Sequence, residues 1–355
     1  MMNQVEKIAD AVLYEGYILY PYRPSSVKNQ QRWNFGALCP HSYSLAQGAT
    51  ESWTMQTECL VEGGPEASIS VKVRFLHLLV REVARPVADC RLPVEECGHQ
   101  QFSSGAAHFV LVPAVEVNGT LLQTWQEAVE RDVYLPALLL NQTADQPTRL
   151  PFFFPATASV ETLLDENSGA TAGVLVRTQE AIQGAVEVSA TRITNNVYKV
   201  NIQILNLTPL ADAGERSRDE ALLRSFVSTH TILTVQNGDF ISLLDPPERF
   251  REAAGQCCNI GTYPVLVGDE GARDCMLSSP IILYDYPQIA PESAGNLYDG
   301  TEIDEILTLR IMTLTDEEKH EMRGADQRAR QLLERTEKIS MEQLLKMHGS
   351  MKSVK

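Results

Sequence analysis

The chain has 355 residues and a formal net charge of −16, with 44% hydrophobic and 21% charged residues. This composition is typical of a globular protein with its own core, and it excludes wholesale disorder. The excess of carboxylates disfavours binding to nucleic acid or to anionic lipid, since both depend on clustered Lys and Arg. We therefore expect no nucleic-acid partner.

Neither export nor membrane insertion is expected from the sequence. The N-terminus lacks a basic start followed by an apolar run, and the apolar runs at residues 135–140 and 151–155 are too short to span a bilayer. The seven cysteines form an odd number, which favours reduced thiols over a disulfide framework. We expect a cytoplasmic protein.

The first part of the chain combines a helix with an aromatic segment. Residues 3–14 are expected to form a helix with Ile8, Ala11 and Val12 on one face. The segment that follows is dense in aromatic and Arg side chains, which are common anchors of protein interfaces. Its alternative role is that of a loop packed across a sheet. These side chains are Tyr17, Tyr20, Tyr22, Arg23, Arg32 and Trp33.

The centre of the chain has the period of β-strands. Apolar residues alternate with polar ones over residues 69–75, which is typical of a half-buried strand. Three dipeptides separate apolar runs and predict two-residue hairpin turns, because Asn and Gly tolerate positive φ. These dipeptides are Asn118-Gly119, Asn195-Asn196 and Asn237-Gly238.

Other segments are weaker signals. Residues 122–132 suggest a short helix, and residues 173–176, 264–267 and 281–284 suggest isolated strands. Strands do not alternate with long helices, so a doubly wound parallel sheet is disfavoured. We expect a mainly β (α+β) fold: an antiparallel β-sandwich or barrel-like body with an N-terminal helix and a helical C-terminal tail.

Residues 279–310 couple an apolar run to a proline-punctuated acidic loop and then to an amphipathic helix. Such a loop is either a fixed binding feature or a hinge to a docking tail. Its carboxylates could receive a basic patch of a partner, bind a hard cation, or stabilise a helix N-terminus. They are Asp285, Glu292, Asp299, Glu302, Asp304 and Glu305.

The end of the chain is expected to be helical. Thr315, Asp326 and Ser340 each precede a short run with the spacing of a helix cap. We place one boundary in the chain. Residues 1–285 form the β-rich body with its N-terminal helix, and residues 286–355 form the acidic loop and a helical tail packed on or extending from that body.

Two triplets share a Cys-x-His spacing, Cys39-Pro40-His41 and Cys97-Gly98-His99. Thiolate and imidazole are preferred ligands of zinc and similar ions, so Cys39, His41, Cys97 and His99 could hold zinc or nickel. The spacing departs from the usual CxxC knuckle. Two unrelated exposed loops are the alternative interpretation.

The remaining reactive side chains have structural interpretations. Cys257 and Cys258 are expected as small buried residues at a tight turn, and His230 as a core histidine on a strand. The sequence has no phosphate-binding glycine loop, dinucleotide fingerprint, HExxH motif or nucleophile elbow. The residues assign no catalytic group.

Two segments resemble a poorly characterised bacterial family that is encoded in nickel-iron hydrogenase gene clusters. They read IADAVLYEGYILYPYRPSSVKNQQRWNFGALCP and SSPIILYDYPQIAPESAGNLYDGTEIDEILTLRIMTLTDEEK. They bracket nearly the whole chain, so the likeness is full length. The resemblance implies an accessory or assembly role and brings no catalytic residues.

We therefore expect a non-enzymatic accessory protein that binds a protein partner, and the resemblance makes that partner a hydrogenase subunit or maturation factor. Two alternatives remain open. One is a metal-binding protein or enzyme that uses the Cys/His residues. The other is a β-sandwich that binds a small ligand.

Overall fold

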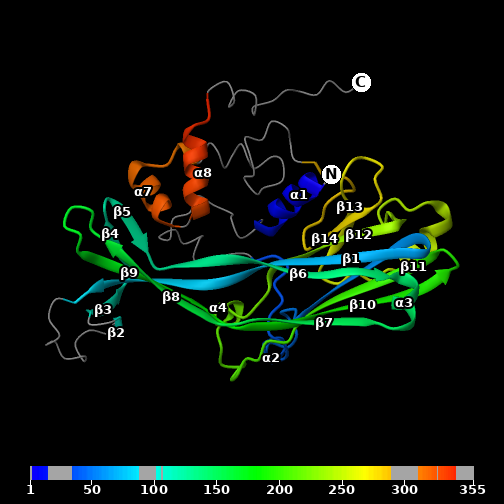
Figure 1. Ribbon diagram of the computed structural model, residues 1–355, viewed down its shortest axis with the longest axis horizontal. Helices are drawn as coiled ribbons and strands as arrows, with labels where there is room; N and C mark the ends of the chain where they lie inside the picture. Colours follow the sequence, from blue (N-terminus) through cyan, green and yellow to red (C-terminus); the bar gives the residue numbers. More distant parts are fainter. Residues whose placement is uncertain are drawn as a thin grey trace.

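A computed structural model shows a long antiparallel sheet with α1, α7 and α8 on one side of it (Figure 1). The structure describes residues 2–14, 34–87, 101–104, 107–288, 311–325 and 327–340. Within these residues the main sheet has 12 strands and is not closed into a barrel. The expected antiparallel β body with an N-terminal helix and C-terminal helices is confirmed.

The strands of the main sheet follow the chain with few long connections. They are β1 (Thr54–Pro86), β2 (Gln101–Ser104), β3 (Ala107–Val112), β6 (Trp125–Leu139), β7 (Thr148–Phe154), β8 (Thr157–Leu164), β9 (Thr171–Gln179), β10 (Ile182–Thr194), β11 (Val197–Asn206), β12 (Val227–Ile241), β13 (Tyr263–Leu266) and β14 (Cys275–Ser279). A separate hairpin consists of β4 (Ala114–Val117) and β5 (Thr120–Gln123).

Most helices are short and flank the sheet. They are α1 (Met2–Tyr14), α2 (His41–Ala46), α3 (Leu140–Asp145), α4 (Arg218–Leu222), the 3-10 turn η2 (Glu248–Phe250), α5 (Arg251–Gly255), α7 (Asp316–Ala325) and α8 (Gln327–Glu337). The expected cap of α7 is present: Thr315 Oγ1 accepts from Glu318 N, and Glu318 Oε2 accepts from Thr315 N. The expected helices over residues 302–310 and after Ser340 lie outside the described residues.

The main sheet bends into two layers, and strand β1, at 33 residues, takes part in both. Its first part pairs with β11, and the sheet continues from there through β10 to β7. Its middle part lies between β12 and β6, and its last part pairs with β9 and β3. One strand therefore holds the two layers together.

A corner in β1 makes this change of layer. Residues 64–67 of β1 stand opposite the single residue Asn237 of β12, between the pairs Gly63↔Gly238 and Ser68↔Gln236. A Cβ on Gly238 would lie 2.9 Å from the Glu62 carbonyl oxygen, and one on Gly63 would lie 2.6 Å from Ala67 Cβ. Glycine at both positions lets the two backbones approach at the bend.

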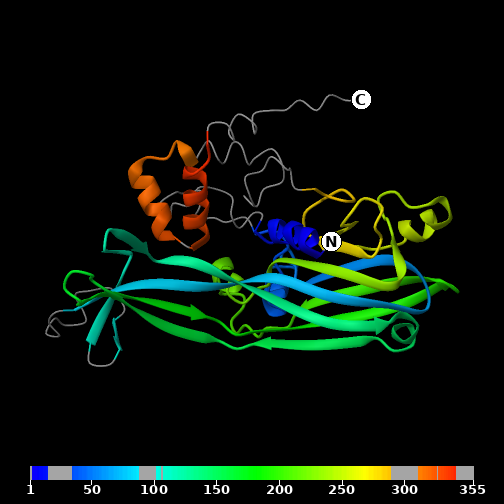
Figure 2. The same cartoon turned by 45° about the horizontal axis from the view of Figure 1, so that its top comes forward.

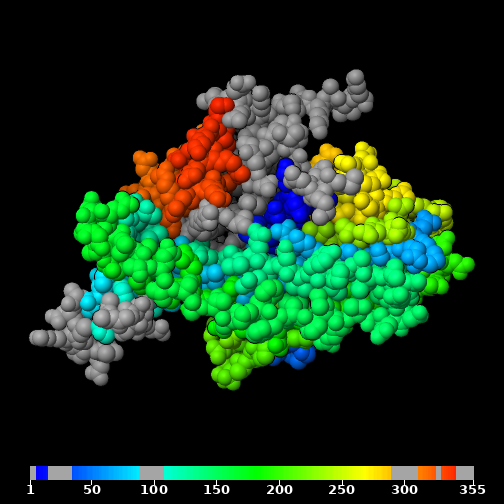
Figure 3. Space-filling view, in the orientation of Figure 1, coloured from blue at the N-terminus to red at the C-terminus, as the bar shows by residue number. Residues whose placement is uncertain are grey.

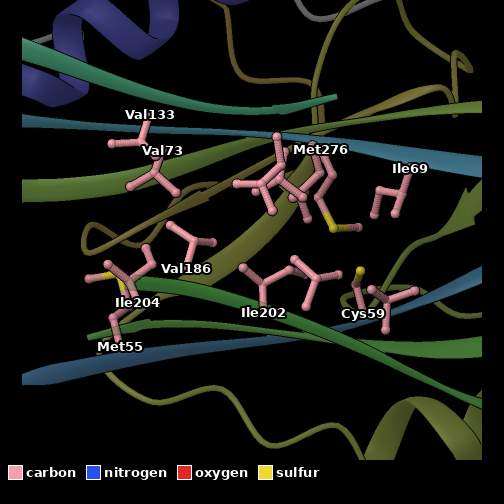
Figure 4. Close-up of a cluster of buried hydrophobic side chains, with 14 of the residues drawn as sticks. Met55, Cys59, Ile69, Val73, Val133, Val186, Ile202, Ile204 and Met276 are labelled. Carbon is pink, nitrogen blue, oxygen red and sulfur yellow. The ribbon is translucent and has the colours of Figure 1, made fainter. Parts of the chain in front are cut away.

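The main core fills the space between the layers (Figure 4). Ile69, Val73 and Val133 lie on one side, and Ile202 and Val186 face them from the other. These residues recur at every second position of their strands, so the alternation in the sequence follows from burial of one strand face.

Helices α1, α7 and α8 lie over one face of the sheet (Figure 2), and a second apolar cluster joins them to it. Leu13 and Tyr14 of α1 and Leu76, Leu78 and Trp125 of the sheet share it with side chains of the C-terminal segment. The latter are Ile311, Leu314, Met322, Ala329, Leu332 and Leu333. The helical segment thus buries its apolar face on the sheet rather than standing away from it.

A buried cation also fixes α1 on the sheet. The Arg74 side chain is almost fully buried and forms ion pairs with Asp10 of α1 (2.8 Å) and with Glu130 (3.1 Å) and Asp132 (3.3 Å) of β6. Tyr14 Oη donates to Glu130 Oε1 at 2.6 Å. The network compensates the charge of Arg74 with carboxylates from two elements.

Two local expectations are wrong. Residues 122–132 do not form a helix, because Trp125 begins β6, which pairs with residues 68–81 of β1. Long-range pairing outweighs the helix propensity of the Glu, Ala and Arg residues there. Residues 237–238 do not form a hairpin turn either, because only Asn237 has positive φ (56°) and β12 continues through the bend.

The other two turns are confirmed. Asn118 and Gly119 both have positive φ (51° and 71°) and connect β4 to β5. Residues 195–196 connect β10 to β11 between the pair Thr194↔Val197. The expected strands at residues 173–176 and 264–267 correspond to β9 and β13.

Candidate functional site

The apolar run at residues 281–284 is not a strand, which corrects the sequence expectation; the strand ends earlier, at Ser279 of β14. The run belongs to a loop, residues 280–288, which we call the pinned loop. The loop has bends at residues 280–281 and 285–286, and Tyr286 has positive φ (57°). Its side chains alternate in exposure over residues 281–284, but within the described residues it has no place in a sheet ladder. Alternation alone therefore does not distinguish a strand from a loop.

Hydrogen bonds hold the pinned loop to the body. Asp285 Oδ1 accepts from Leu266 N (2.8 Å), and its Oδ2 accepts from Ser242 Oγ (2.6 Å). Tyr286 N donates to the Leu266 carbonyl (2.7 Å), and Tyr286 Oη donates to the Ala272 carbonyl (3.0 Å). Asp285, expected to contact a partner, thus fastens the loop to the ends of β12 and β13.

The pinned loop divides its apolar side chains between core and solvent. Ile281 and Leu283 pack against the cluster that α1 forms with Val265 and Leu277. Ile282 and Tyr284 are 72% and 86% exposed. A fixed backbone therefore displays two large apolar side chains two positions apart, as the anchors of protein interfaces are displayed.

A small cavity of about 190 Å³ lies beside the pinned loop. Asp285 and Tyr286 form one wall, and Arg273, Asp245 and Phe250 contribute to the others. The cavity can accept a single side chain of a partner rather than a cofactor. In the space-filling view, the segment that carries it and the α7–α8 pair rise from the same side of the sheet, with α1 between them (Figure 3).

A larger cleft of about 820 Å³ separates α8 from the sheet. Its floor carries alternating charges: Glu127 bonds Arg81 (3.0 Å) and Arg177 (2.9 Å), and Arg177 bonds Glu161 (2.7 Å). Arg81 also donates to the carbonyl of Gly324 in α7 (3.0 Å). These groups compensate one another, and the floor holds the helical pair on the sheet.

Two of the four Cys/His candidates lie in the described residues. Cys39 is fully buried, burial raises the pKa of its thiol, and its Sγ lies 4.0 Å from Glu51 Oε2. His41 is exposed and its ring lies 4.1 Å from that of Trp53. Cys97 and His99 lie outside the described residues. Among the residues that are described, no group of three or more His, Cys, Asp or Glu side chains could hold a metal ion.

Most of the expected partner-binding residues lie outside the described part of the chain. They are Tyr17, Tyr20, Tyr22, Arg23, Arg32, Trp33, Glu292, Asp299, Glu302, Asp304 and Glu305. Of the described residues that flank these segments, Tyr14 and Ile311 are buried in the cluster that joins the helices to the sheet, Asn34 is half-buried and Gln288 is exposed.

The remaining candidates have structural roles. His230 lies in the core as expected, and its Nδ1 donates to the Ser228 carbonyl at 3.0 Å. Cys257 is half-buried, but Cys258 is exposed, so the expectation that both are buried is wrong for Cys258. Its N–H donates to Glu58 Oε2 at 2.8 Å. Burial favours a raised pKa for Glu58, but this bond and those from Asn201 and Lys199 keep its pKa below the ordinary value.

No protein-family model matches the chain, and no curated protein matches it. None of the helices in the described ranges is both long and apolar enough to cross a membrane.

We did not predict from the sequence that Ile282 and Tyr284 are exposed. A signal was present, since Pro280 and Pro287 bracket an alternating run. Proline cannot donate to a ladder, so an apolar run between two prolines favours an extended segment outside a sheet. Residue 36 must be glycine to pack against the start of the pinned loop, because a Cβ there would lie 2.7 Å from the Pro280 side chain.

Proposed function

We propose that this chain is a cytoplasmic, non-enzymatic accessory protein that binds a protein partner through the pinned loop. The observation that carries the proposal is the exposure of Ile282 and Tyr284 on a backbone that Asp285 and Tyr286 hold in place. Interface energy concentrates in such anchors, and a loop that is ordered before binding loses less entropy on association.

The chemistry of the partner follows from charge. The net charge of −16 favours a partner with a basic surface, because opposite charges accelerate encounter and fix orientation. The resemblance of the two sequence segments makes a nickel-iron hydrogenase subunit or maturation factor the first partner to test.

Co-purification tests the proposal. The tagged chain, expressed in the organism that encodes it, is compared with an Ile282→Ser/Tyr284→Ser variant, and bound proteins are quantified by mass spectrometry. We expect the variant to lose at least about 90% of the bound partner, since two central anchors are removed. Hydrogenase proteins among the lost species would support the identity of the partner.

Tyr134→Ser is the matched control, because Tyr134 is also 61% exposed but lies on β6. It is expected to retain the partner. If the loop variant and the control capture the same proteins in the same amounts, the pinned loop is not the docking site and the proposal fails.

A further inference from the structure

Strand β8 forms an edge of the main sheet. It pairs antiparallel with β9, and within the described residues no strand lies on its other side (Figure 1). Seven of its eight residues are exposed, Leu163 being half-buried. An edge strand presents a row of backbone N–H and C=O groups that a further strand can pair with.

Three of the other edge strands in the described residues contain proline, which cannot donate to an added strand: Pro151 in β7, Pro136 in β6 and Pro264 in β13. The fourth, β2, has only four residues. The sequence of β8, TASVETLL, has no proline and no lysine. Since natural proteins commonly protect their edges, an unprotected edge of this length indicates a use.

The strand is held in place before any partner arrives. Asn118 Nδ2, in the β4–β5 turn, donates to the Leu164 carbonyl (2.9 Å), and Asn118 Oδ1 accepts from Glu166 N (3.0 Å). Along its inner edge β8 pairs with β9 from Thr157 to Leu164. Such a template requires little ordering when a segment is added.

Side chains and charge define the segment that fits. Val160 and Leu164 are 48% and 54% exposed, so an added strand gains apolar contacts at these two positions. Glu161 already pairs with Arg177, so the negative charge that remains for a partner comes from Asp165 and Glu166 at the end of the strand. A second copy of this chain would bring the same negative charges, whereas a segment flanked by lysine or arginine would complement them.

From these observations we infer that β8 accepts an extended, basic-flanked segment of a protein partner as an additional strand. The inference rests on the proposed function, because it names a second contact for the same class of partner. The main-chain hydrogen bonds would give affinity, and Val160 and Leu164 would give a preference for apolar residues opposite them.

A designed peptide tests the inference directly. The probe alternates threonine and valine and ends in lysine on both sides, and its binding is measured by fluorescence anisotropy. One control peptide has proline at its centre and another ends in glutamate. We expect both controls to bind at least about tenfold more weakly, because proline removes a ladder hydrogen bond and glutamate meets like charges.

Two substitutions form a matched pair in the protein. Neighbouring amides of a strand point to opposite edges, so one of Ser159→Pro and Val160→Pro removes an outward N–H and the other removes an N–H that faces β9. Only the substitution that removes the outward N–H should leave the stability of the chain unchanged. The variant that is as stable as the parent chain is therefore expected not to bind the probe. Hydrogen exchange should also slow at every second amide of residues 157–164 when the probe is added.

Four results would overturn the inference. One is equal binding of the probe and its proline control. Another is unchanged exchange at residues 157–164. The third is a dimer of the free chain, seen by light scattering, that the stable proline variant dissociates. In the co-purification assay, a partner lost by the Ile282→Ser/Tyr284→Ser variant but kept by the stable proline variant would sink this inference and leave the proposed function intact.

Discussion

At the scale of single residues, buried polar groups in this protein are used to fix elements. Arg74 joins α1 to β6 through three carboxylates, and Asp285 holds the pinned loop to two strands. His230 lies beside this first network, opposite Arg74 in the pairing of β12 with β1. Among the described residues its Nε2 has no hydrogen-bond partner, so a second proton on the ring would be unsatisfied.

His230 is expected to make stability depend on pH. Burial lowers the pKa of His230 from 6.5 to about 4, and the positive charge of Arg74 acts in the same direction. Below about pH 6.5 the unfolded chain therefore binds a proton at His230 that the folded chain does not bind. The free energy of unfolding then falls as the pH approaches 4. Between about pH 7.5 and 4.5 this difference amounts to about 2–3 kcal/mol.

Urea unfolding of the parent chain and of His230→Leu at these two pH values measures the effect. The variant is expected to lose about 2–3 kcal/mol less than the parent on acidification, whatever its stability at neutral pH. Identical losses in the two proteins would show that His230 is not the group that titrates. The pKa of His77, also lowered to about 4 by burial, sets a similar dependence that both proteins share.

At the scale of elements, close backbone contacts decide where helices sit. Gly324 near the end of α7 touches β5, and a Cβ there would collide with the Leu121 carbonyl. Its own carbonyl accepts from Arg81. This glycine therefore permits the helical pair to approach the sheet, although glycine is a poor helix former.

Gly324→Ala is expected to destabilise the protein. In an exposed helix the change would add about 1 kcal/mol of stability. Here α7 must move away from β5, and we expect the free energy of unfolding to fall by about 1–3 kcal/mol. Gly255→Ala at the end of α5 is the control, because a Cβ there meets nothing within 4 Å. A stabilised Gly324→Ala variant in urea unfolding would contradict the close contact.

Local signals predicted some elements well and failed where pairing is long-range. The Asn118-Gly119 turn follows from the φ preferences of its own two residues. β6 could not be distinguished from a helix, because its structure depends on β1 residues about fifty positions earlier. Asp285 holds the pinned loop, and thereby exposes Tyr284, through bonds to Leu266 and Ser242. The sequence does not show that these two residues lie beside Asp285.

At the scale of the whole molecule, the C-terminal helices are part of one packed unit with the sheet. Their apolar side chains lie with Leu76, Leu78 and Trp125 in a single cluster. Each fully buried side chain of this kind contributes about 1.5–3 kcal/mol. The boundary expected at residues 285 and 286 is thus crossed by a substantial apolar contact.

Ending the chain after Gln288 is expected to expose this face of the sheet. The truncated protein should bind a hydrophobic dye such as ANS strongly and should unfold at a lower temperature than the full chain, since exposed apolar patches bind such dyes. Dye fluorescence and thermal unfolding by circular dichroism measure both effects. A truncated protein with the dye binding and melting temperature of the full chain would mean that the contact contributes no stability.

The corner at residues 63–67 also divides β1 into two halves, and each half pairs with its neighbouring strands in its own register. A residue inserted within either half would turn the following side chains to the opposite face and bring polar groups into the core. A residue inserted at the corner would lengthen an irregular bend and leave both registers unchanged. Changes of length during the history of this chain should therefore accumulate at residues 64–66, deep within what the ribbon shows as a single strand.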